Sequence, residues 1–261
     1  MHCPSFRRLL SACRPAIRRG PVALVLVQDG IGVAETAARL AAAGVRCRLA
    51  LGPASAPAGA WTGSAPFDVH APGAMAAAAN ALARAAPGTW ILPMWNGERI
   101  AWPHGDSRPL PDLLAFLQEE RRPVLGGVVL DSYPLAAGWG IDRMGYGMAG
   151  DAIHGGLRER IGPPCPAAGR RIDRVLAFRA APGLGFDAQM RLNDPALDRR
   201  HGDWHRSPTG ALVSPRVWAW LEAQPDHDSR TLPRGWSGSA ELDGTARQLW
   251  DLGFIEPGQW V

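Results

Sequence analysis

Residues 90–134 decide the fold, and they read WILPMWNGERIAWPHGDSRPLPDLLAFLQEERRPVLGGVVLDSYP. The apolar run Trp90–Met94 predicts a strand, and the polar turn Trp95–Glu98 follows it. Leu113–Glu120 then predicts a helix. Val124–Leu130 predicts a second strand, and its continuous apolar character is typical of a strand that is covered on both faces. The stretch therefore predicts a strand, an acidic turn, a helix and a buried strand, in that order.

The residues before this stretch repeat the same alternation. Ser5–Arg14 predicts a short amphipathic helix, because its apolar residues recur at helical spacing. Val22–Val27 predicts a buried strand that ends in the turn Gln28–Gly30. Glu35–Ala43 predicts an alanine-rich helix, and Val45–Leu51 predicts a strand. A strand, a helix and a strand in this order favour a parallel pair with a right-handed crossover.

The rest of the first half completes an α/β pattern. Gly52–Gly73 is rich in Pro, Ala, Gly and Ser and predicts a loop, and Ala74–Ala86 predicts a buried helix. Ala136–Arg171 is glycine-rich and predicts a long surface excursion, whereas Ile172–Phe178 predicts a further strand. Strands and helices that alternate over Val22–Pro134 predict a three-layer α/β/α, Rossmann-like fold with a mostly parallel sheet.

The C-terminal part has a weaker pattern. We expect a core over residues 1–193 and a loop and helical region over residues 194–261. Pro215–Ala223 and Ala240–Leu252 predict two helices. We expect these helices to dock through a hydrophobic cluster of Trp218, Leu221, Leu249 and Trp250.

Composition excludes several classes of protein. The chain has 261 residues, 46% of them hydrophobic, which is enough for one sizeable core. No apolar run approaches the roughly 20 residues of a membrane span, and residues 1–8, MHCPSFRR, lack the apolar segment of a signal peptide. The net charge is +4 and every basic residue is arginine, which is weak support for nucleic-acid binding. The four cysteines form no CxxC pair. We therefore expect a cytoplasmic protein without a membrane span, a nucleic-acid partner or a disulfide framework.

Several motifs between residues 6 and 134 follow one another in a recognisable order. They are Gln28-Asp29-Gly30, Gly88-Thr89-Trp90, Trp95-Asn96-Gly97-Glu98, Trp102-Pro103, Arg108-Pro109-Leu110-Pro111 and Leu130-Asp131-Ser132-Tyr133-Pro134. This series, which covers about half of the chain, resembles a family 2-type glycosyltransferase with the GT-A fold. The resemblance implies a nucleotide-sugar ligand, a glycan acceptor and a place in bacterial surface polysaccharide synthesis.

The resemblance also implies which residues form a site. Members of that family carry Asp-x-Asp-Glu where this chain has Trp95–Glu98. The residues expected to bind substrate are therefore Asp29, Trp95, Asn96 and Glu98. Asp131, in the LDSYP segment, is the expected catalytic residue. Trp95 is also suited to stack against a sugar or a base. The alternative is that Trp95–Glu98 is a simple surface turn.

The resemblance also bears on a divalent metal at such a site. Carboxylates of the acidic motif hold Mn²⁺ or Mg²⁺, which offsets the charge of the sugar diphosphate. Here Trp95 and Gly97 replace the two aspartates, so Glu98 remains, with His201 and His205 as further candidate ligands at i, i+4 spacing. The alternative for the two histidines is a solvated loop. We expect no tight metal at the turn itself, and a metal cofactor only if the protein is active.

Two hypotheses about function follow. The first is a glycosyltransferase that transfers a hexosyl group, or a degenerate member that binds the nucleotide sugar without transfer. The second is a non-catalytic binding or regulatory module on the same scaffold, which docks a protein partner through its C-terminal helices. For the first, Gln28–Gly30 and Trp95–Glu98 must open on the same edge of the sheet, because ligands bind at the carboxyl ends of parallel strands.

Overall fold

The computed structural model describes residues 1–30, 32–53, 57, 59–135, 138–141, 174–194, 197, 207–215 and 240–260. The chain divides into two compact units, each built from separate stretches of sequence. Unit 1 comprises Met1–Gly97, Ser107–Gly126 and Val175–Arg199. Unit 2 comprises Glu98–Asp106, Gly127–Arg174 and Arg200–Val261.

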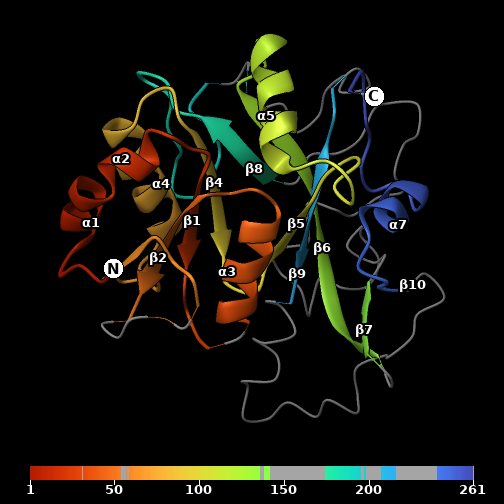
Figure 1. Cartoon of the computed structure of the whole chain (residues 1–261), viewed down its shortest axis with the longest axis horizontal. Coiled ribbons are helices and arrows are strands. Elements are labelled where there is room, and N and C mark those ends of the chain that lie inside the picture. Colours follow the sequence, from red (N-terminus) through yellow and green to blue (C-terminus); the bar gives the residue numbers. More distant parts are fainter. Residues whose placement is uncertain are drawn as a thin grey trace. The chain divides into compact units, whose positions relative to one another are not determined.

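Unit 1 contains most of the elements that the sequence predicts. Its helices are α1 (Phe6–Ala12), α2 (Arg14–Ile17), α3 (Val33–Ala42), α4 (Ala74–Ala85) and α5 (Leu110–Glu119). Its strands are β1 (Val22–Leu26), β2 (Cys47–Gly52), β3 (Gly63–Pro66), β4 (Trp90–Trp95) and β8 (Arg174–Arg179), whose first residue belongs to unit 2. All of these strands except β3 are labelled in Figure 1. The strand β6 (Val124–Leu135) starts in unit 1 and continues into unit 2. The alternation predicted over residues 22–134 is therefore confirmed as an α/β structure.

The sheet of unit 1 has the strand order β3-β2-β1-β4-β8. The strand β1 is parallel to both β2 and β4, and β2 is parallel to β3, whereas β8 is antiparallel to β4. From β1 the chain proceeds outward through β2 to β3 and then returns to the other side of β1 as β4. The order of the strands therefore reverses between β1 and β4, which makes this place a topological switch point.

One prediction for unit 1 was wrong. Gly52–Gly73 was expected to be loop throughout, but Gly63–Pro66 forms the strand β3 beside β2. The four residues Gly-Ser-Ala-Pro carry no apolar alternation, so nothing in them indicates a strand. Glycine is required at the start of β3, because a Cβ on Gly63 would lie 2.5 Å from Leu9 and 2.9 Å from the sulfur of Cys13. The close packing of α1 on the edge of the sheet therefore depends on this residue.

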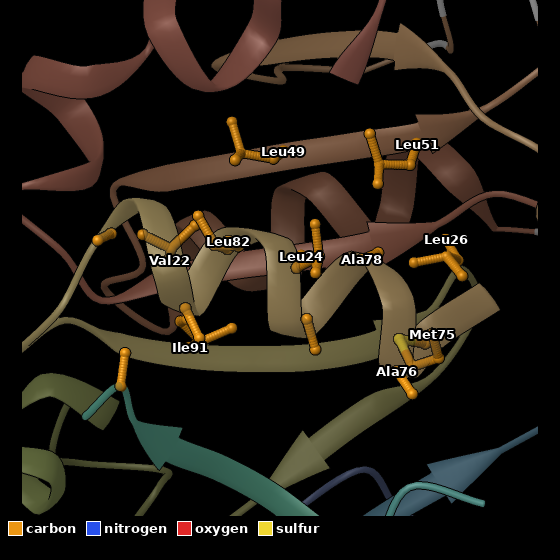
Figure 2. Packing of buried hydrophobic residues seen from close by; sticks show 14 of the residues in the cluster. Val22, Leu24, Leu26, Leu49, Leu51, Met75, Ala76, Ala78, Leu82 and Ile91 are labelled. Atoms are coloured by element: carbon orange, nitrogen blue, oxygen red, sulfur yellow. The ribbon is translucent and has the colours of Figure 1, made fainter. Parts of the chain in front are cut away.

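The core of unit 1 lies between α4 and the sheet (Figure 2). Leu24 of β1, Leu49 of β2 and Ile91 of β4 are fully buried and face Ala78 and Leu82 of α4 in one cluster. Small alanine side chains let this helix approach the strands closely. Each buried leucine or isoleucine contributes about 1.5–3 kcal/mol through removal of its apolar surface from water.

The second face of the same sheet is also covered. Ala23 and Val25 alternate with the residues that face α4, so they point to the opposite side, and both are fully buried. The helix α3 lies on that side of the strands (Figure 2). Helices on both faces explain why β1 reads as a continuous apolar run.

Unit 2 contains a second, smaller group of strands. They are β5 (Arg99–Ala101), β7 (Gly138–Ile141), β9 (Gly210–Ser214) and β10 (Ala240–Glu241), together with the continuation of β6. The strand β9 is parallel to β6 and antiparallel to β5, and β7 joins β6 to β10 by antiparallel pairing. The short helix α7 (Ala246–Asp251) follows β10.

These strands correct two predictions. Gly138–Ile141 pairs with β6, so this part of the expected surface excursion is a strand. The expected helix Ala240–Leu252 is divided into the two-residue strand β10 and the helix α7, and a strand, β9, also comes from the C-terminal region. The strands β9 and β10 pair with β5, β6 and β7, which are distant in the sequence, so local periodicity does not reveal them.

The C-terminal segment docks through apolar side chains. Leu249, Phe254 and Ile255 are buried in one cluster with residues of β6 and β9, and Trp250 packs against the same cluster. The predicted contribution of Leu249 and Trp250 to a docking cluster is thus confirmed. The other two predicted members, Trp218 and Leu221, lie outside the described residues, as does the predicted helix Pro215–Ala223 apart from Pro215.

No helix in the described part of the chain is both long enough and apolar enough to cross a bilayer.

Candidate functional site

The turns that follow β1 and β4 open at the same edge of the unit 1 sheet. The strands are parallel neighbours in register, with Val22 opposite Ile91 and Leu26 opposite Trp95. The backbone continues this pairing beyond the strands, because Asn96 N donates to Leu26 O at 2.9 Å. The expectation that Gln28–Gly30 lies at the same edge as the end of β4 is therefore confirmed.

Asn96 joins the two turns through its side chain. Its Oδ1 accepts a hydrogen bond from Gln28 N at 3.1 Å. Its Nδ2 donates to Asp29 O and to Asp29 Oδ1, each at 3.1 Å. The residue is fully buried, so these bonds are shielded from competition by water. Asn96 therefore fixes both the backbone of the β1 turn and the direction of the Asp29 carboxylate.

A second set of contacts ties the start of α3 to the β4 turn. Gly32, the N-cap of α3, has φ of 60°, a left-handed conformation. Its carbonyl accepts from Thr36 Oγ1 at 2.7 Å, and the same hydroxyl accepts from Gly97 N at 2.9 Å. A Cβ on Gly32 would lie 3.5 Å from Gly97 Cα, so the two turns are in contact.

The backbone conformation of Gly97 favours glycine at this position of the turn. Its φ is 82°, which glycine adopts freely and side-chain-bearing residues rarely do. An aspartate at this position would have to strain the turn or change its path. The backbone geometry of the turn therefore accounts for glycine at position 97.

The remaining predicted residues of unit 1 are partly accessible. Asp29 and Trp95 are each half-buried, whereas Gly30 is exposed. Trp95 packs one part of its side chain against the main core cluster. The carboxylate of Asp29 and the ring of Trp95 thus sit at the switch point, where open α/β sheets bind ligands.

Glu98, the next residue of the chain, belongs to unit 2 and is 3% exposed. Its Oε1 lies 2.8 Å from Nη1 of Arg174, at the start of β8, and the Arg174 side chain is 15% exposed. A buried carboxylate needs a partner of opposite charge, and the guanidinium supplies it. Sequence reasoning missed Arg174, because nothing near it in the sequence indicates a partner 76 residues away.

Three predicted residues have side chains that lie outside what the structure describes. The backbone of Asp131 lies in β6 opposite Ser214 of β9, but its side chain is outside what the structure describes. His201 and His205 also lie outside the described residues. Within the described ranges, no three His, Cys, Asp or Glu side chains are grouped so that they could hold a metal ion.

Comparison of the chain with protein-family models, curated proteins and solved structures finds no match. The class of protein therefore rests on the fold and the site alone. Unit 1 is an α/β structure with a mostly parallel sheet. At its switch point lies a hydrogen-bonded polar cluster, which consists of Gln28, Asp29 and Asn96.

Proposed function

We propose that the protein binds a nucleotide sugar at the carboxyl edge of β1 and β4, on a GT-A-like scaffold of the family 2 glycosyltransferase type. The observation that carries the proposal is the position of Asp29. Its carboxylate is oriented by Asn96 at the topological switch point of the sheet. Ligands of open α/β sheets bind in the crevice outside such a point.

The chemistry of the edge suits the nucleoside part of the ligand. An ionised carboxylate is an acceptor only, so Asp29 suits donors such as ribose hydroxyls or the N–H groups of a base. The half-buried ring of Trp95 offers an aromatic face of the kind that stacks on bases and sugars. Asn96 is a positioning residue in this proposal, because its amide is already bonded to Gln28 and Asp29.

If the protein transfers the sugar, the proposed acceptor is a glycan of bacterial surface polysaccharide and the proposed cofactor is Mn²⁺ or Mg²⁺. A non-catalytic binding module on the same scaffold is the second candidate. The ion pair between Glu98 and Arg174 favours it, because the remaining carboxylate of the acidic motif already has a cationic partner at 2.8 Å. A protein partner at the C-terminal segment is part of that second candidate.

Binding is tested by calorimetry with UDP-, GDP- and dTDP-sugars, in Mn²⁺ and again in EDTA. We expect one nucleotide class to bind, and Asp29→Asn to weaken its affinity at least about ten-fold, since hydrogen bonds to a charged group contribute about 1.5–3 kcal/mol. Asp68→Asn is the matched control, since Asp68 is an exposed carboxylate of unit 1 that also accepts a local backbone N–H. Failure of all three classes to bind would refute the proposal.

The same samples distinguish the two candidates. Release of the nucleoside diphosphate in the presence of Mn²⁺ and a glycan acceptor supports transfer. Binding that is unaffected by EDTA and is accompanied by no release supports the non-catalytic module.

A further inference from the structure

The distribution of charge along the chain is strongly uneven. Residues 1–28 contain five arginines and no aspartate or glutamate. The remaining 233 residues contain 23 arginines and 24 carboxylates, so they are close to neutral. The whole excess of positive charge therefore comes from the N-terminal 28 residues.

We call the five arginines, which come from α1, α2 and the segment that follows, the N-terminal arginine surface: Arg7, Arg8, Arg14, Arg18 and Arg19. All five are exposed. The opposite side of α1 is apolar, with Leu9 and Cys13 buried in the core and Phe6 edge-on to Phe67, with ring centroids 5.8 Å apart. The helix is thus held by its apolar side, and its charged side faces outward.

Within the described part of the chain, these arginines form no ion pair. The one side-chain hydrogen bond among them runs from Arg19 Nε to Pro15 O, at 3.1 Å, and leaves the charge uncompensated. Phe67, which Phe6 contacts, is followed in the sequence by Asp68, and the carboxylate of Asp68 accepts from His70 N. A solvated array of like charges on two consecutive helices attracts a partner that is itself an extended anion.

The arginine surface lies away from the proposed ligand site. Arg18 and Arg19 immediately precede Gly20-Pro21 and the first residue of β1, whereas Asp29 follows its last residue. The two features thus lie toward opposite ends of the same strand, and α1 and α2 carry no residue of the polar cluster (Figure 1). A partner on the arginine surface leaves the carboxyl edge of the sheet open.

We propose that the N-terminal arginine surface docks unit 1 onto an anionic phospholipid bilayer. The headgroups of such a bilayer form a planar array of phosphates, which suits guanidinium groups spread over two surface helices. A nucleic acid fits less well, because the exposed residues between the arginines are Ser11, Ala12 and Pro15, which offer no ring or amide to stack on or read a base. This inference does not depend on the nucleotide-sugar proposal.

Sedimentation with vesicles tests the inference. The protein is mixed with phosphatidylcholine vesicles that contain either no anionic lipid or about one third phosphatidylglycerol. We expect binding to the anionic vesicles alone, and its loss when the salt is raised from about 0.1 M to about 0.5 M, because the Debye length shortens. Equal binding to both kinds of vesicle, or to neither, overturns the proposal.

Two double variants that each remove two positive charges test whether the vesicles bind at the N-terminal arginine surface. Each arginine near an anionic membrane is expected to contribute about a five-fold factor in partitioning, so Arg8→Gln with Arg18→Gln should weaken binding roughly 25-fold. Arg39→Gln with Arg191→Gln removes the same charge from exposed positions elsewhere in unit 1 and should change binding less than about two-fold. Circular dichroism establishes that both variants are folded.

Nucleic acid is tested as the alternative partner. Fluorescence anisotropy measures the affinity of the protein for a duplex RNA and for a duplex DNA. If either binds more tightly than the anionic vesicles and loses affinity with the same two substitutions, the partner is a nucleic acid and the bilayer proposal is wrong.

Discussion

The side-chain amide of Asn96 donates to both the backbone carbonyl and the carboxylate of Asp29, 67 residues earlier in the sequence. Its oxygen accepts from Gln28 N, so one fully buried amide uses both of its ends to hold the turn after β1. The carboxylate of Asp29 therefore has a direction that is set before any ligand arrives. Preorganisation of this kind reduces the ordering cost of binding.

We predict that Asn96→Ala lowers the free energy of unfolding by about 2–3 kcal/mol, because it leaves Gln28 N and Asp29 without their buried partner. Nucleotide binding should be lost in the same variant. Urea unfolding measures the first effect and calorimetry the second.

The control for this variant is Asn80→Ala. Asn80 also bridges distant segments of unit 1, since its amide donates to Phe186 O and accepts from Phe186 N at 2.9 and 2.8 Å. We expect a similar loss of stability but unchanged affinity for the nucleotide. If both variants lose binding equally, Asn96 acts through general stability and does not position Asp29.

We predict strong coupling between Glu98 and Arg174. Removal of either partner leaves a buried charge, so Glu98→Gln and Arg174→Met should each cost about 3–5 kcal/mol. The double variant should cost at least about 2 kcal/mol less than the sum of the two. Urea unfolding of the four proteins gives the coupling energy directly. If the changes in unfolding free energy of the two single variants simply add in the double variant, the ion pair at 2.8 Å contributes little to stability. Glu98 would then be a candidate for another role, such as metal binding.

We predict that Asp106→Ala loosens the C-terminal segment of unit 2. The two carboxylate oxygens of Asp106 accept from Ala246 N at 2.9 Å and from Arg247 N at 3.0 Å, so this distant residue caps the first turn of α7. Loss of a cap of this kind costs about 1 kcal/mol. Hydrogen exchange at the amides of Ala246 and Arg247 should accelerate accordingly. In Asp112→Ala, which removes an exposed carboxylate from the first turn of α5, exchange at these two amides should not change.

We predict that Cys47 makes stability fall at alkaline pH. Burial, reinforced by the neighbouring Cys13, raises the pKa of the Cys47 thiol from 9.0 to about 12. Above pH 9 the unfolded chain loses this proton while the folded chain keeps it, so the unfolded state binds fewer protons and stability decreases as pH rises. The decrease should be about 1.4 kcal/mol per pH unit between the two pKa values.

The measurement is a comparison of wild type with Cys47→Ala. The two proteins share every other titration, so the difference between their unfolding free energies isolates Cys47. That difference should change steadily in favour of the alanine variant between pH 9 and pH 11. A constant difference would mean that the thiol has similar pKa values in the folded and unfolded chains.

Local pattern was enough to predict most of unit 1. The apolar run at Val22, the alanine-rich stretch at Ala74 and the run at Trp90 each became the expected element, because burial on one or both faces imposes a composition that can be read in a short window. The common edge of the Gln28 and Trp95 turns also followed, since parallel strands must end on the same side.

The short strands could not be predicted in this way. β9 (Gly210–Ser214) and β3 (Gly63–Pro66) have five and four residues, and β3 contains no apolar alternation. The hydrogen bonds of β9 go to β6 and β5, which are distant in the sequence, and those of β3 go to the preceding strand β2 across a loop. A strand of this length exists because its neighbours offer unpaired backbone groups, and that condition is met only in the folded chain.

The sequence by itself determined the α/β class and the identity of the polar residues at the end of β4. The tertiary structure alone decided what those residues do. It turned the Asn96 amide toward Asp29 and paired Glu98 with Arg174, although the partners are 67 and 76 residues apart. A buried polar group must be paired with a group that the fold places beside it, and the spacing of residues in the sequence does not indicate which group that is.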